Sequence, residues 1–152
     1  MKNKSTVLIF IFFILSNCAF EPIYSSKKVD FDIIKIESAK KDRLNSTIKK
    51  YLKNTSNNES VNKYRIKIDA NKNKIISSKD KKGNAQVLTM IISVKIEIYK
   101  MDSLINTKNF SEQFIYSNNS NKFDLSKYEK NIEKNLTNKI LSNITLFMLT
   151  LK

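Results

Sequence analysis

The chain of 152 residues contains one cysteine, Cys18, and no histidine. A cysteine thiolate is a nucleophile, but a single cysteine cannot form an intramolecular disulfide or a metal site that needs several cysteines. Without histidine, the chain lacks the most common general base and the most common zinc ligand. Its single glycine, Gly83, excludes glycine-rich phosphate-binding loops. These residue counts exclude most templates for catalysis.

Serine and carboxylate side chains are the other candidates for chemistry. Ser-x-x-Lys spacings occur five times, but 17 Ser and 26 Lys make them common by chance, and no Ser-Asp-Asn or Lys-Thr-Gly partner is present. The pairs Asp30/Asp32 and Glu129/Glu133 alternate with apolar residues among lysines, which predicts solvated faces. We therefore expect no enzyme activity, no catalytic residue, no metal site and no cofactor.

Lysine dominates the charge of the chain. The net charge of +14, from 28 Lys+Arg against 14 Asp+Glu, favours an anionic partner such as nucleic acid, a membrane surface or an acidic glycolipid. An AT-rich genome would also enrich Lys, Asn and Ile, so both explanations stay open. Lys79, Lys81 and Lys82 gather with Lys72 and Lys74 in and before a turn between two strands. Such flexible ammonium groups can reach phosphates, and a solvated, protective turn is the alternative.

The N-terminal residues have the pattern of a secretion signal. Lys2 and Lys4 precede a nine-residue apolar run, Val7 to Leu15, which is too short to span a bilayer. The sequence Leu15-Ser16-Asn17-Cys18 resembles the lipobox of bacterial lipoproteins, in which the cysteine is lipidated. A free buried cysteine after a simple signal peptide is the alternative.

The lipobox defines the expected organisation of the chain. We expect a lipoprotein signal peptide over residues 1–17, a lipidated N-terminus and tether over 18–28, and a single α/β domain over 29–152. Acyl chains on Cys18, palmitate among them, would give stable membrane anchoring. Ala19 stands where an Asp would retain such a lipoprotein in the inner membrane, which favours the periplasmic side of the outer membrane.

Hydrophobic periodicity predicts an α+β fold. Leu88 to Ile98 alternate over six inward positions, which is the pattern of a half-buried strand, and residues 124–149 repeat apolar side chains every three or four positions, as a helix does. The expected order is β-α-β-β-β-α, a two-layer sandwich in which two helices cover one face of a four-stranded sheet. The expected elements are strands over 29–36, 64–70 (extended by Ile75 and Ile76), 85–99 and 105–116, helices over 42–53 and 124–149, and turns over 77–84 and 100–103.

The apolar segment Ile144–Leu151, which closes the last expected helix, is apolar on nearly all sides. Packing into the core at the helix end is one interpretation. Contact with a partner is the other.

The residues after the lipobox point to a family. Cys18-Ala19-Phe20-Glu21-Pro22-Ile23-Tyr24 resembles the start of the mature LPS-assembly lipoproteins of the LptE family, Cys-Gly-Phe-x-Pro-Leu-Tyr. Chain length and the expected order of elements are also similar to that family, whereas Ala19 and Ile23 depart from its motif. The resemblance covers seven residues by motif and the rest of the mature chain by pattern.

The resemblance implies a function without catalysis. An LptE-like protein plugs the LptD β-barrel of the outer membrane, assists its assembly, and takes part in lipopolysaccharide transport to the outer leaflet. Basic residues at one end of that fold contact lipopolysaccharide, which from charge and position suggests Lys79, Lys81 and Lys82 here. The alternative is a structural lipoprotein subunit of another envelope complex. Nucleic acid is not an expected partner of a secreted chain.

Overall fold

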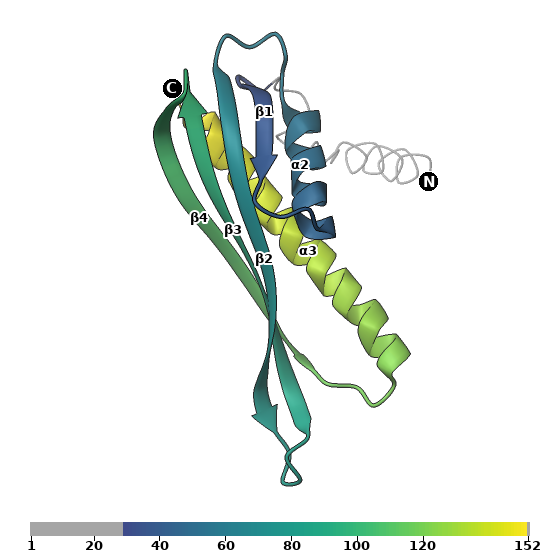
Figure 1. Cartoon of the computed structure of the whole chain (residues 1–152). Helices are drawn as coiled ribbons and strands as arrows, with labels where there is room; N and C mark the ends of the chain where they lie inside the picture. The colour runs from purple at the N-terminus through teal and green to yellow at the C-terminus, as the bar shows by residue number, and fades with distance from the viewer. Residues whose placement is uncertain (1–28, 152) are drawn as a thin grey trace, which may run out of the picture.

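The computed structural model describes residues 29–151 as one sheet with two helices (Figure 1). The sheet has the order β1-β2-β3-β4, with β1 parallel to β2 and the other pairs antiparallel. Both helices pack on one face of the sheet, so the expected α+β sandwich in the order β-α-β-β-β-α is confirmed. Cys18, the expected signal peptide and the tether lie outside the described residues. The elements are β1 (Asp32–Ser38), α2 (Arg43–Thr55), β2 (Lys63–Lys79), β3 (Ala85–Lys100), β4 (Ser103–Ser117) and α3 (Lys122–Leu149).

Helix α2 begins where its sequence predicts. The Asp42 carboxylate accepts a hydrogen bond of 2.8 Å from the backbone N–H of Asn45, which satisfies a donor that has no partner within the helix. Leu44, Ile48 and Leu52 recur at intervals of four residues and are all buried. This apolar stripe holds α2 on β1 and β2.

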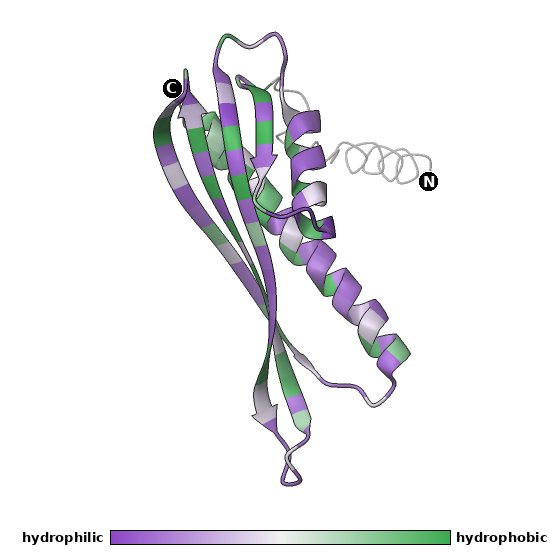
Figure 2. Cartoon of the chain, viewed as in Figure 1, coloured by the Kyte–Doolittle hydropathy of each residue, from purple (hydrophilic) through white to green (hydrophobic). Residues whose placement is uncertain are grey.

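The core lies between the helices and the inward face of β2 and β3. Hydrophilic and hydrophobic residues alternate along these strands in Figure 2, as a strand with one buried face requires. Burial of each large side chain stabilises the fold by about 1.5–3 kcal/mol. On β2, β3 and α3 the buried apolar residues of this core are Tyr64, Ile66, Ile68 and Ala70 of β2, Leu88, Met90, Ile92, Val94, Ile96 and Ile98 of β3, and Leu125, Ile132, Leu136, Ile140, Leu141, Ile144 and Met148 of α3.

The first strand departs from its predicted pattern. It begins at Asp32, three residues later than expected, and a register shift between Ile33 and Lys35 breaks the alternation of its side chains. Ile33 and Ile36 are therefore both buried. The prediction that Asp32 is solvated is wrong, because its buried carboxylate accepts a hydrogen bond of 2.8 Å from the Ser56 hydroxyl.

The end of α3 contributes to the core on one side only. Ile144 and Met148 are buried, and the ring of Phe147 packs edge-on against Phe110 with centroids 5.9 Å apart. Leu146 and Leu149 stay exposed on the other side. Core packing thus accounts for part of this apolar segment. No helix within residues 29–151 is both long enough and apolar enough to cross a membrane.

Both residues of the turn between β3 and β4 have a left-handed backbone conformation. Met101 and Asp102 both have positive φ, 48° and 65°, and Asp102 is held by Arg65 at 3.1 Å. A methionine in this left-handed conformation costs about 1 kcal/mol, whereas asparagine tolerates it. Met101 is 94% exposed, so its side chain has little burial to lose. Met101→Asn is therefore expected to raise the free energy of unfolding by about 0.5–1 kcal/mol, as measured by urea unfolding. Equal or lower stability would show that the backbone of Met101 is not strained.

Candidate functional site

The turn that joins β2 and β3 is built around one carboxylate. Asp80 accepts hydrogen bonds of 2.8 Å from the backbone N–H groups of Lys82 and Asn84, and one of 3.0 Å from the side-chain amide of Asn84. These bonds, led by that of the Asn84 side chain, hold the pKa of Asp80 below its usual value. Gly83 has φ +84°, a conformation that suits glycine. The carboxylate therefore serves to shape the turn.

Three lysines surround this turn without carboxylate partners. Lys79, Lys81 and Lys82 are exposed, and none forms an ion pair within the described part of the chain. We call them the basic tip. Figure 2 shows the turn as a hydrophilic end of a long hairpin. Three ammonium groups on one turn can bind neighbouring phosphate oxygens as flexible point charges.

Lys72 and Lys74 do not belong to the basic tip, contrary to the cluster that the sequence suggests. Their side chains cross to α3, where Lys72 contacts Glu133 at 2.7 Å and Lys74 contacts Glu129 at 3.1 Å. The expectation that Glu129 and Glu133 are simply solvated is therefore wrong. These pairs join the helix to the sheet. The basic tip is therefore left with three lysines close together that have no ion-pair partner among the described residues.

Glu129 is the centre of a small network that joins α3 to β2 and β4. The Tyr116 hydroxyl donates a hydrogen bond of 2.7 Å to the same carboxylate that Lys74 contacts. Burial alone would raise the pKa of Glu129, but the hydrogen bonds from Tyr116 and Lys74 and the charge of Lys74 outweigh it and lower the pKa. Burial and the bond to Glu129 raise the pKa of Tyr116.

The lowered pKa of Glu129 predicts a pH-dependent contribution to stability. A carboxylate with a depressed pKa stabilises the fold above its unfolded pKa, and this stabilisation is lost as the pH falls through the folded value. Glu129→Gln is expected to be less stable than the parent at pH 7, and the difference in their free energies of unfolding should shrink as the pH falls from 7 through the acidic range below about 4.5. Urea unfolding of both proteins across this range measures it; a pH-independent difference would contradict the role of the charge.

Exposed apolar side chains lie near the turn end of the hairpin, on both faces of the sheet. Ile75 of β2 and Ile115 of β4 both pair with Thr89 of β3, so their exposed side chains lie on the face of the sheet that the helices do not cover. Phe123 is 77% exposed at the start of α3. The exposed apolar side chains that lie around the paired strands form what we call the distal apolar zone: Ile75, Ile76, Phe114, Ile115 and Tyr128. Sequence periodicity missed it, because it places Phe114 and Tyr128 on buried faces. A basic tip beside an apolar zone suits an amphiphile that carries both phosphates and acyl chains.

The tip and the start of the described chain lie at opposite ends of the molecule (Figure 1). Asp32 pairs with Lys63, the first residue of β2, and the tip follows Lys79, the last residue of this 17-residue strand. At 3.3 Å per residue, the strand separates the two ends by about 50 Å. Within residues 29–151, no group of three or more cysteine or carboxylate side chains is placed to hold a metal ion.

Comparisons with known proteins support the fold. No protein-family model and no curated protein sequence matches the chain. A minor lipoprotein from Acinetobacter baumannii aligns at TM-score 0.59 and 12% identity over 80% of this chain and 91% of that one. Uncharacterized lipoprotein B from Nitrosomonas europaea gives 0.60 and 14%, over 77% and 83%. Rare lipoprotein B from Shewanella oneidensis gives 0.55 and 11%, over 76% and 96%. The chain therefore has the fold of these three bacterial lipoproteins.

Proposed function

We propose that this chain is a non-catalytic, LptE-like lipoprotein of the outer membrane. It is anchored on the periplasmic side through a lipidated Cys18, plugs an LptD-like β-barrel and helps that barrel to assemble. Its role is binding during lipopolysaccharide transport to the outer leaflet. The lipobox, the motif from Cys18 to Tyr24 and the shared lipoprotein fold support this proposal.

The observation that carries the proposal is the unpaired basic tip at the far end of the fold, beside the distal apolar zone. Lipopolysaccharide offers phosphates to Lys79, Lys81 and Lys82, and acyl chains to exposed side chains such as Ile76 and Ile115. The basic tip lies about 50 Å from the start of the described chain, which is more than the thickness of a bilayer, about 40–45 Å with its headgroups. A chain anchored at the inner leaflet and aligned with the axis of a barrel is therefore long enough to place its tip at the level of the outer leaflet.

Depletion of the chain from living cells tests the proposal. We expect the level of correctly assembled barrel to fall, and newly made lipopolysaccharide to disappear from the cell surface, while unrelated outer-membrane barrels keep their levels. A structural subunit of another envelope complex would leave both unchanged. That result would overturn the proposed function.

A further inference from the structure

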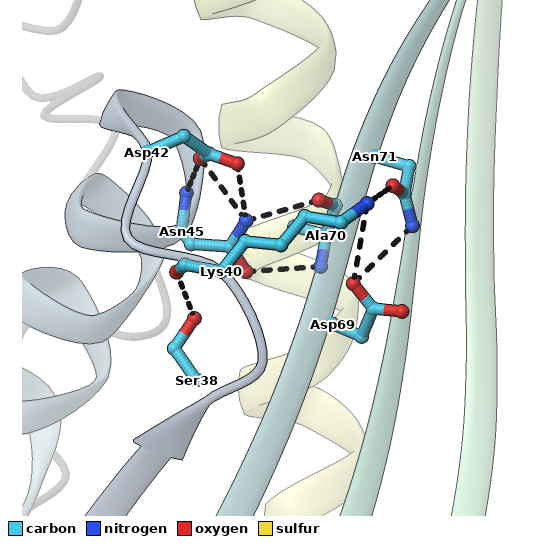
Figure 3. A network of polar contacts seen from close by, with 7 residues as sticks. All are labelled: Ser38, Lys40, Asp42, Asn45, Asp69, Ala70 and Asn71. Carbon is cyan, nitrogen blue, oxygen red and sulfur yellow. Dashed lines mark hydrogen bonds and ion pairs between the residues drawn. The ribbon is translucent and has the colours of Figure 1, made fainter.

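The outer edge of β2 is only half covered. β1 pairs with β2 from Lys63 to Ile68, whereas β2 continues to Lys79. At Ala70 the side chain of Asn45 takes the place of a strand: its amide nitrogen donates to the Ala70 carbonyl and its oxygen accepts from the Ala70 N–H, both at 3.0 Å (Figure 3). Asp42 and the start of α2 hold Asn45 in this position. The edge is thus closed at Ala70 by a side chain and is open beyond it.

The backbone groups beyond Ala70 alternate between the two edges of β2. Since both polar groups of Ala70 point to the outer edge, those of Lys72 and Lys74 do so too, and those of Asn71 and Asn73 face β3. Within the described chain, no hydrogen bond reaches the outward N–H and C=O groups of Lys72 and Lys74. Such a row of unpaired donors and acceptors is a template for another strand.

A groove lies beside this edge with room for the side chains of an added strand. It has a volume of about 620 Å³ and runs between the start of α2, β2 and α3. Arg43 and Lys130 line it, and neither has an ion-pair partner among residues 29–151. Three carboxylates also line the groove, and each has a partner: Glu133 and Glu129 pair with Lys72 and Lys74, and Asp42 bonds to Asn45. Every second side chain of a strand on this edge would point over the groove, where an acidic side chain would meet Arg43 or Lys130.

We propose that the free edge of β2, at Lys72 and Lys74, binds an extended acidic segment of a partner protein by β-strand addition. The inference deepens the proposed function, and it rests on that function only in taking the partner to be a protein. A second protein backbone carries N–H and C=O groups at the same spacing as the edge, whereas an acyl chain carries none.

Two other occupants fit less well. A second copy paired edge to edge would place the lysines of one β2 against those of the other, and like charges opposite each other destabilise a strand pair. Residues 18–28 span at most about 40 Å, and the free edge begins about 30 Å along β2 from the start of the described chain. That segment would therefore have few residues left to pair.

Hydrogen exchange resolved to single amides tests the proposal on the whole chain purified in detergent. The ligand is an eight-residue peptide in which Val and Glu alternate, and its control carries Lys in place of Glu. We expect the acidic peptide to slow exchange of the Lys72 and Lys74 amides by about tenfold or more, because they face outward. The Asn71 and Asn73 amides, bonded to β3, serve as internal references. Unchanged exchange at Lys72 and Lys74, or equal protection by both peptides, would overturn the proposal.

A proline substitution separates strand addition from side-chain contact. Lys74→Pro removes an outward N–H and no bond to β3, so the strand is expected to persist while protection by the peptide is lost. Lys74→Ala loses the same contact with Glu129 but keeps the N–H, and should retain protection. Equal protection in both variants would contradict an edge-on mode. The peptide experiment involves no barrel and no lipopolysaccharide, so its failure is distinguishable from failure in the depletion experiment.

Discussion

Replacement of Lys79, Lys81 and Lys82 by alanine is expected to weaken binding to lipopolysaccharide by about tenfold at moderate salt. Exposed charge pairs contribute about 0.2–1 kcal/mol each, and about 1.4 kcal/mol corresponds to a factor of ten. The fold should keep its stability, because the three ammonium groups form no ion pair within the described residues and Asp80 holds the turn through backbone bonds.

A charge-matched control makes this result specific. Lys41, Lys49 and Lys50 are exposed at or on α2, at the opposite end of the molecule from the basic tip, and their triple alanine variant loses the same net charge. If the basic tip is the site, this control should bind lipopolysaccharide nearly as the parent does when titrated at several salt concentrations. Equal weakening by both triples would mean that the overall charge attracts the ligand. Unchanged binding by the tip triple would remove the tip from the site.

Replacement of Cys18 by alanine is expected to move the chain from the membrane fraction to the soluble envelope fraction. Two or more acyl chains anchor a protein stably, and Cys18 is the only thiol to which a diacylglycerol can be attached. Labelled palmitate should enter the parent and not the variant. Label that persists in Cys18→Ala, or no label in the parent, would contradict lipidation at this residue.

Periodicity predicts the layers of this fold well, because both the strands and the helices bury one continuous face. The alternation from Leu88 to Ile98 and the helical repeat from Leu125 to Met148 reflect burial directly, and each is confirmed except at Tyr128, which is half exposed. Periodicity does not predict the bulge in β1, because the bulge arises from the register in which β1 pairs with β2. Asp32 is therefore buried at a position where alternation predicts a solvent-exposed side chain.

The candidate site is less accessible to sequence reasoning, because its features depend on pairing between distant segments. Lys72 and Lys74 look like members of the basic cluster until α3 brings Glu133 and Glu129 to them from more than 50 positions away. The free edge of β2 is set by the short length of β1. The bond between Asn45 and Ala70 likewise follows from where α2 begins. Only the basic tip itself is visible as a local run of lysines beside the lone glycine.

The proposed function requires this chain to work inside a complex with a β-barrel. The most direct test is isolation of the affinity-tagged chain from solubilised membranes under mild detergent, followed by mass spectrometry of the proteins that come with it and their molar ratios. We predict one large outer-membrane β-barrel protein in near-equal amount. Recovery of the chain alone, or with soluble envelope proteins and no barrel, would contradict the account.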